Sequence, residues 1–565
     1  MRPLDWWILI GSLVLVVVYG LWRSRDSGTV NKYLLAGKTM PWYAMALSIM
    51  ATQASAITFI STTGQSYVDG MRFVQFYFGL PLAMVILSAT AVPIFHRANV
   101  YTAYEYLEQR FDAKTRALVS VIFLIQRGLA IGVALYAPAI VLTVLLGWPD
   151  RLTTIVMGGL VVLYTTIGGI KAVTWTDVQQ MVVMMTGLVA ALVTAVWLLP
   201  AEVSFLDAVR LAGASGKLNP VVTRLDWNDR YNLWSGLLGG MFLALAYFGC
   251  DQSQVQRYLT GRSIAQSRLS LLFNAAAKVP MQFLILFIGT IVFVFYIFER
   301  PPLVFQPVEL ARLENSGAAY RQVAERYEAA FEERREAARG LLEARGKGET
   351  SAVAQSLERY READRDFEAA REEGLRLARE QRNQPGFNDT NYIFLGFVTR
   401  YMPAGLVGLV MAAIFAAAMS SISAEINSLA TVSVIDIYQR HFRRQASDAH
   451  YLKAARLATI FWGAYAVVTA EFGSSLGALI EAVNILGSYF YGGLLGVFVL
   501  AFYFKQVTGN GAFYGVLAGE AAIFLVAHLT GISFLWYNVV GCLVVIAVGV
   551  GLSRLERAVP GRVQA

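Results

Sequence analysis

Apolar stretches of about 20 residues recur along most of this 565-residue chain, and they limit its fold more than any other feature. A run of that length spans the hydrocarbon core of a bilayer as a helix, with every backbone polar group satisfied inside the segment. The composition agrees, because 56% of the residues are hydrophobic and only 15% are charged, too few to cover the surface of a soluble protein. We therefore predict an all-α membrane protein embedded in a lipid bilayer.

The hydropathy pattern predicts about 13 transmembrane helices. Their approximate cores are residues 5–22, 41–68, 73–95, 117–146, 152–168, 176–198, 232–249, 267–298, 402–436, 455–472, 476–502, 511–530 and 534–553. We interpret the first run as a retained helix rather than a signal peptide, since Asp5 precedes it and no small-residue cleavage site follows.

The positive charges are distributed unevenly among the loops. Lys and Arg gather after the first predicted helix and in alternate loops from there to the C-terminus, while the loops near 70, 150, 473 and 531 carry few. Positive loops stay in the cytoplasm, which predicts an outside N-terminus and a cytoplasmic C-terminus in a multi-pass protein of the plasma membrane, in a bacterium the inner membrane. The same loops account for the net charge of +8, so we do not expect nucleic acid as a partner.

One charged segment, residues 306–386, interrupts the apolar pattern. Its apolar residues recur at three-and-four spacing on both sides of Gly346-Lys347-Gly348, which predicts two amphipathic helices packed as an antiparallel hairpin. Helix parity places it outside the membrane, and three units follow: helices 1–8 in 1–298, the hairpin insertion in 299–390 and helices 9–13 in 391–565. We expect an independent satellite that is either a passive insertion or a binding surface for a protein partner.

Polar residues interrupt the second predicted helix at Ala51-Thr52-Gln53-Ala54-Ser55. Such an interruption marks a discontinuous helix, whose freed backbone carbonyls must find a partner in lipid. A hard cation is one such partner, because hard cations take oxygen ligands. The alternative is close helix packing through small residues.

The ninth predicted helix carries Ser420, Ser421 and Ser423 within one turn. Ser420 and Ser423 share a face, so these hydroxyls would complete an oxygen cage with the carbonyls of the second helix. The alternative is that each hydroxyl bonds a carbonyl one turn earlier on its own helix. No nucleophile–base pair, phosphate-binding loop or metal cluster accompanies these residues, so we do not expect an enzyme.

Taken together, several motifs resemble the sodium:solute symporter family, which includes the sodium/galactose and sodium/proline symporters. They are SIMATQASA at 48–56, YEYLEQRF at 104–111, GGIKAVTWTD at 168–177, DQSQVQRYL at 251–259 and SSISAEINS at 420–428, which runs on to Asp436-Ile-Tyr. The resemblance covers the membrane segments and omits 306–386. It implies a five-plus-five inverted repeat of the leucine-transporter type, formed by helices 2–6 and 7–11.

The resemblance also implies where the coupling ion, sodium, would bind. The family's sodium site maps onto the carbonyls of Ala51, Ala54 and Ala417 and the hydroxyls of Ser420 and Ser421. A second sodium site of some members maps onto Asp177 and Ser423. However, Ala424 stands where a further hydroxyl is expected, so the alternative for Asp177 is a charge paired with a nearby Arg or Lys.

Solute-lining positions of the sugar-type members map onto Gln53, Ser55, Thr58 and Lys278, although Gln53 and Thr58 differ from the sugar pattern. Arg127, deep in the fourth predicted helix, is the further candidate, because an intramembrane Arg is costly and its guanidinium suits a carboxylate. The alternative is an Arg that reaches the cytoplasmic headgroups.

Arg127 has no acidic residue within one helical turn, so we expect the solute to supply its counter-ion. The chain is therefore predicted to be a sodium-coupled secondary active symporter that imports a small polar, anionic organic solute by alternating access. The alternative function is a membrane sensor or regulatory subunit that does not transport and signals through the external hairpin.

Overall fold

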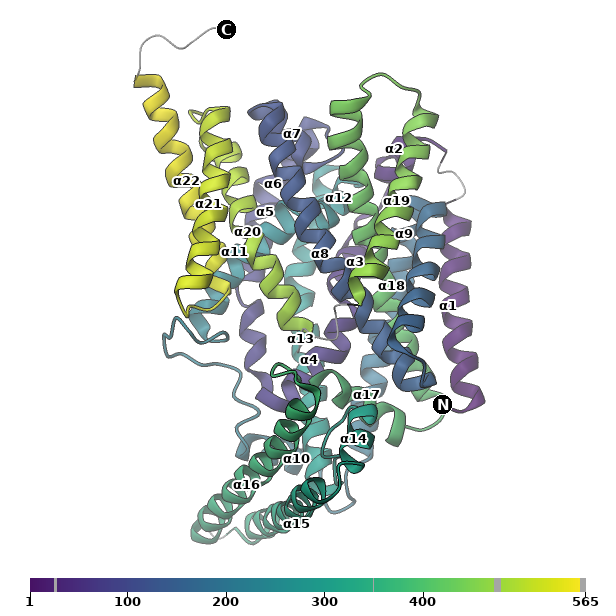
Figure 1. Cartoon of the computed structure of the whole chain (residues 1–565), viewed down its shortest axis with the longest axis vertical. Coiled ribbons are helices and arrows are strands. Elements are labelled where there is room, and N and C mark those ends of the chain that lie inside the picture. Colours follow the sequence, from purple (N-terminus) through teal and green to yellow (C-terminus); the bar gives the residue numbers. More distant parts are fainter. Residues whose placement is uncertain (25–27, 349, 472–478, 559–565) are drawn as a thin grey trace.

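The computed structural model describes residues 1–24, 28–348, 350–471 and 479–558, and all of the regular elements in these ranges are helices (Figure 1). The helices that build the membrane bundle are α1 (Pro3–Arg23), α3 (Trp42–Gln53), α4 (Ala56–Asp69), α5 (Leu80–Ala89), α6 (Ala91–Ala98), α8 (Ala113–Leu146), α9 (Asp150–Trp197), α11 (Gly240–Gly249), α13 (Ile264–Phe298), α18 (Leu406–Val432), α19 (Asp448–Ala470), α20 (Leu479–Tyr503), α21 (Gly509–Leu529) and α22 (Leu535–Ala558). The predicted all-α membrane fold is confirmed.

Among the described residues, nine helical stretches are long and apolar enough to cross a membrane. Thirteen spans were predicted: Ser235–Gly249 is too short to be counted, α19 is not among the nine, and two pairs of neighbouring spans each join into one stretch. For example, α9 has 48 residues, about 72 Å at 1.5 Å per residue, and bends where Gly169 takes a positive φ of 59°. Residues 472–478, which hold the end of one predicted core and the start of the next, lie outside the described residues.

Two of the helix breaks in the described part of the chain interrupt the second and seventh predicted helices. The first break separates α3 from α4 at Ala54, whose φ and ψ of −88° and 69° are not helical. This confirms the predicted interruption of the second helix. The second break separates α11 from α12 (Gln252–Leu259), and there the Asp251 side chain caps α12 by accepting a hydrogen bond from the Ser253 amide. Each break lies in the first helix of one predicted five-helix repeat, as the inverted repeat requires.

Helix α18 is buried along almost its whole length and packs against α1, α3, α4, α8, α9 and α19. Its small and polar residues suit this position, because small residues let helices pack closely and polar side chains within a membrane face the bundle interior rather than lipid. The serines at 420–423 and Glu425 are therefore all held at the centre of the protein. The next segment, Ser433–Phe442, widens into a π-helix.

The charged insertion folds as the predicted helical hairpin, at one end of the bundle (Figure 1). It comprises α14 (Pro307–Glu314), α15 (Ala318–Lys347) and α16 (Thr350–Arg382), with α15 and α16 packed along each other. It is not an independent satellite, however. The buried Arg334 donates to the Tyr296 carbonyl of α13 at 2.5 Å, and Tyr360 bonds Ser215, just after α10 (Phe205–Ala214), at 2.7 Å. The sequence could not reveal these contacts, because they join segments 38 and 145 residues apart.

A cavity beside the helix breaks

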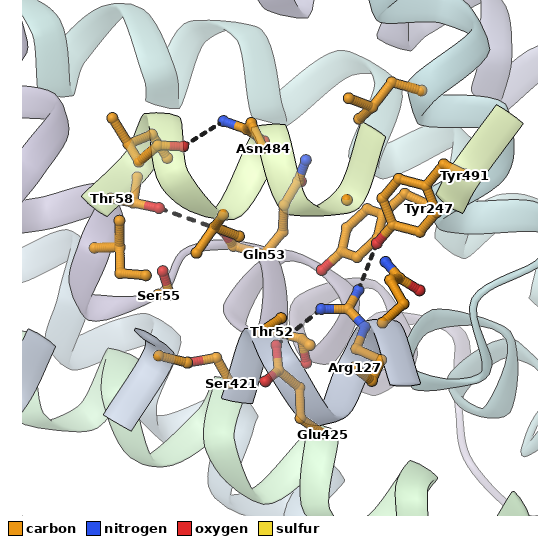
Figure 2. Close-up of a pocket in the computed structure, with 18 of the residues that line it drawn as sticks. Thr52, Gln53, Ser55, Thr58, Arg127, Tyr247, Ser421, Glu425, Asn484 and Tyr491 are labelled. Atoms are coloured by element: carbon orange, nitrogen blue, oxygen red, sulfur yellow. Dashed lines mark hydrogen bonds and ion pairs between the residues drawn. The ribbon is translucent and has the colours of Figure 1, made fainter. Parts of the chain in front are cut away.

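A cavity of about 110 Å³ lies against the α3–α4 break (Figure 2). Its walls come from α3, α4, the segment Gly70–Tyr77, α8, α11, α18 and α20, so both predicted repeats contribute to it. The polar lining side chains are Thr52, Gln53, Ser55, Thr58, Tyr77, Gln126, Arg127, Tyr247, Ser421, Glu425, Asn484 and Tyr491. Apolar side chains such as Ile57, Phe76 and Leu243 cover the rest of the wall. A concave pocket that combines apolar wall with converging polar side chains is the usual form of a small-molecule site.

Arg127 is the positively charged residue in this lining, and its guanidinium is held on three sides. Nε donates to Asp251 Oδ2 at 2.7 Å, Nη1 donates to Glu425 Oε1 at 3.0 Å, and Nη2 donates to the Tyr491 hydroxyl at 2.8 Å. The Tyr491 hydroxyl donates in turn to Asp251 Oδ2 at 3.0 Å. These partners come from the α11–α12 break, α18 and α20, so the network ties three parts of the bundle to α8.

This network corrects one sequence-based expectation. The solute is not needed as the counter-ion of Arg127, because two protein carboxylates already serve that purpose. The expectation rested on the acidic residues within one helical turn of Arg127. Asp251 and Glu425 lie 124 and 298 residues further along the chain. Arg127 does line the cavity, and at 4% side-chain exposure it does not reach the headgroups.

The residues predicted to hold sodium lie on α18 and at the C-terminal end of α3, two elements that pack against each other. Ala51 lies in the last turn of α3 and Ala54 at its C-cap, so the break leaves carbonyls there without the amide donors of a continuous helix. On α18, Ala417, Ser420 and Ser421 are buried, and Ser421 also lines the cavity. Carbonyl and hydroxyl oxygens are the ligands that a hard cation takes, so the residues at this position fit sodium.

Two of the hydroxyls also have protein partners. Ser421 Oγ donates to the carbonyls of Ala417 and Ala418 at 3.1 and 3.2 Å, which is the local bonding that the sequence left open as an alternative. Ser420 Oγ donates to Asp177 Oδ1 at 2.6 Å. The structure thus joins Ser420 and Asp177, which the sequence assigned to two different ion sites.

Asp177 is fully buried near the middle of α9, and both of its oxygens are engaged. Oδ2 accepts from Ser48 and lies 3.5 Å from Arg257 Nη2 on α12. A buried Arg beside Asp177 is the charge pairing that the sequence offered as the alternative to a second ion. Ser423 Oγ donates to the Ser420 carbonyl at 3.0 Å rather than to Asp177.

The predicted solute residues divide into two groups. Gln53, Ser55 and Thr58 line the cavity beside the break, with the Thr58 hydroxyl 3.4 Å from the Gln53 carbonyl. Lys278 is not in the cavity lining. Its ammonium lies buried behind Tyr77, 5.4 Å from the ring centre, with no hydrogen-bond partner in the described part of the chain.

Sequence reasoning missed the roles of Asp251, Tyr247, Asn484 and Tyr491. Asp251 opens the DQSQVQRYL motif, so the signal was present, but nothing in the sequence indicated that this residue breaks a helix and faces Arg127. Tyr247 is one helical turn before Asp251, and its ring lies 5.2 Å from the Arg127 guanidinium carbon. The aromatic residues of α20 resembled ordinary lipid-facing or core residues and gave no signal.

Comparisons with known proteins agree with this architecture. The family model described as "Sodium:solute symporter family" matches residues 33–316 and 382–519, and the unmatched gap contains α15 and nearly all of α16. A sodium/sialic acid symporter of Aliivibrio fischeri is 26% identical over 97% of this chain and 92% of its own length. The human sodium-coupled monocarboxylate transporter 1 is 26% identical over 92% of this chain and 72% of its own.

Among solved structures, a substrate-bound, outward-open Na⁺-coupled sialic acid symporter superposes with a TM-score of 0.75 at 23% identity, over 98% of each chain. This likeness shows the fold. The family model covers most of the membrane segments, and the resemblance that the motifs carried is confirmed. The chain belongs to the sodium:solute symporter family.

Proposed function

We propose that this protein is a sodium-coupled symporter that imports a small organic acid by alternating access. The observation that carries the proposal is the cavity at the α3–α4 break, where the first turn of α4 and the α18 serines meet. A broken helix at mid-membrane exposes carbonyls on one side of the break and amides on the other. The carbonyl side would bind sodium through Ala51, Ala54, Ala417, Ser420 and Ser421.

The amide side of the break suits a carboxylate. Helix α4 has 14 residues, and its N-cap Ser55 does not use its hydroxyl to cap the helix. The partial positive charge of the helix N-terminus attracts an anionic group. Ser55, Ile57 and Thr58 of this first turn all line the cavity. Two of the relatives named above carry sialic acid or monocarboxylate in their names, and both are acids.

The sodium gradient is sufficient to drive accumulation of such a solute. One positive charge gains about 2.3 kcal/mol per 100 mV, and a tenfold sodium gradient adds about 1.4 kcal/mol. At about 1.4 kcal/mol per decade, one ion supports several-hundredfold accumulation of a neutral or zwitterionic solute. A singly charged acid with one sodium ion moves no net charge, so the gradient alone supports about tenfold.

We further propose that the protein lies in the plasma membrane, in a bacterium the inner membrane, with its N-terminus outside and its C-terminus in the cytoplasm. The N-terminus and the charged hairpin lie at the same end of the bundle, and the C-terminal helix α22 ends at the opposite end (Figure 1). The positive loops of the sequence put that opposite end in the cytoplasm.

Uptake into proteoliposomes tests the proposal. We expect labelled small acids to accumulate with an inward sodium gradient and not with an equal potassium gradient. The double variant Ser420→Ala/Ser421→Ala should lose this sodium dependence, because apolar side chains supply no replacement oxygen ligands. Ser428→Ala is the matched control, since Ser428 is buried on the same helix and donates to the Glu425 carbonyl, outside the cavity lining.

Unchanged sodium dependence in the double variant would show that Ser420 and Ser421 do not bind the ion. Sodium binding without uptake of any acid would contradict the transport proposal and would favour the sensor function instead.

A further inference from the structure

Glu425 is a buried carboxylate in the cavity wall, and one of its two oxygens has a hydrogen-bond partner among the described residues. The residue is 8% exposed and lies one helical turn beyond Ser421, which lines the same cavity. Oε1 accepts from Arg127 Nη1 at 3.0 Å, whereas Oε2 is buried with no hydrogen-bond partner among the described residues. In Figure 2 one oxygen points at Arg127 and the other lies on the Ser421 side.

A buried carboxylate oxygen without a donor destabilises the fold, because the oxygen loses its hydrogen bonds to water and gains none from the protein. The other polar groups of the network are occupied elsewhere. Arg127 is already shared by Asp251, Glu425 and Tyr491, and the Ser421 hydroxyl donates to backbone carbonyls. These groups therefore do not supply the donor that Oε2 lacks.

The charge of the network indicates what kind of donor fits. One guanidinium faces two carboxyl groups, so with both carboxyls ionised Arg127, Asp251 and Glu425 carry one more negative than positive charge. Lys278 does not compensate for it, since its ammonium is behind Tyr77 and outside the lining. This part of the cavity repels an anion and attracts a positively charged donor.

The proposed carboxylate position lies elsewhere in the same cavity. Ser55 and Thr58, at the first turn of α4, are on one side in Figure 2, and Arg127 and Glu425 are on the other. The cavity thus has one end that suits an anionic group and one that suits a cationic donor.

We propose that Glu425 determines specificity by accepting a hydrogen bond from an ammonium group of the solute, so that the transported acid is an amino acid. The inference rests on the proposed function, because it assigns the second half of the same solute site. The cavity volume of about 110 Å³ suits a small amino acid.

Three acids with one carbon skeleton test the proposal. L-Alanine, L-lactate and propionate differ only in carrying an ammonium, a hydroxyl or a hydrogen at the second carbon. Their affinities are measured by thermal shift of the purified full-length protein in sodium and in potassium. The same series with L-leucine, 2-hydroxy-4-methylpentanoate and 4-methylpentanoate covers a larger side chain.

We expect the amino acid to bind at least about 10-fold more tightly than the acid without the amino group, as a charge-assisted hydrogen bond implies. Glu425→Gln should reduce this preference to within about threefold, since the neutral amide keeps the shape but loses the charge. Glu520→Gln is the control variant. Glu520 on α21 is also a carboxylate without a partner in the described residues, but it does not line the cavity.

Each outcome decides the question. Equal binding of the three acids would overturn the ammonium inference and leave the proposed symport of acids in place. No sodium-dependent binding of any acid would refute the carboxylate position, and with it the proposed solute class. Loss of sodium-dependent stabilisation in Glu425→Gln without solute would show that Glu425 binds the ion, which also overturns the inference. If Glu425→Gln does not fold, the wild-type series alone decides.

Discussion

Replacing Arg127 by Met should destabilise the protein strongly, because it leaves two carboxylates buried without their cation. Asp251 and Glu425 accept from Arg127 at 2.7 and 3.0 Å, and all three side chains are almost completely shielded from water. At an effective dielectric constant of about 20, charges about 4 Å apart attract by about 4 kcal/mol per pair. Desolvation of the ions offsets most of this gain, yet removing one partner of a buried pair costs about 3–5 kcal/mol.

The assay is the free energy of unfolding of the full-length protein in mixed detergent micelles. Arg127→Met should lower it by about 3–5 kcal/mol, and adding Asp251→Asn and Glu425→Gln to the same chain should restore much of the loss. Arg151→Met is the control. Arg151 pairs with Glu471 at 3.4 Å, but its side chain is 78% exposed, so the cost should stay below about 1 kcal/mol.

A loss for Arg127→Met as small as for Arg151→Met would refute the reasoning, because it would mean that the Arg127 carboxylates are hydrated or protonated. Failure of the neutral triple variant to recover stability would show that shape and hydrogen bonding, not charge, hold the network together.

Two further predictions follow from pairings outside this network. Asp177 is paired with Arg257, and Ala424 offers no hydroxyl, so sodium-dependent uptake should show a Hill coefficient for sodium near one. A Hill coefficient near two that falls to one in Asp177→Asn would establish a second sodium ion. Arg334→Met should lower the free energy of unfolding by about 2 kcal/mol or more, because Arg334 is buried between the Tyr296 carbonyl and the Phe367 ring, 3.6 Å away. Arg326→Met, with an exposed side chain paired to Glu373, is the control, and equal stability of the two variants would support a detachable hairpin.

The sequence by itself determined the membrane class, the helical fold and the interruption of the second helix. These follow from local physics: a run of apolar residues must form a helix in lipid, and small polar residues at Ala51–Ser55 break one. The charged hairpin could also be predicted from local sequence, since its apolar spacing and the glycines at 346 and 348 lie within one segment. The motifs at 48–56 and 420–428 also indicated the family that the comparisons then showed.

The tertiary structure alone decided which buried charges meet. Arg127 looked unpaired because its partners are 124 and 298 residues away, brought to it by the α11–α12 break and the central α18. Likewise, Arg257 forms an ion pair with Asp177, and Arg334 of the hairpin donates a hydrogen bond to the Tyr296 carbonyl of α13. Side-chain pairing in a bundle depends on how helices far apart in the sequence cross, whereas hydropathy and periodicity report only on neighbours along one helix.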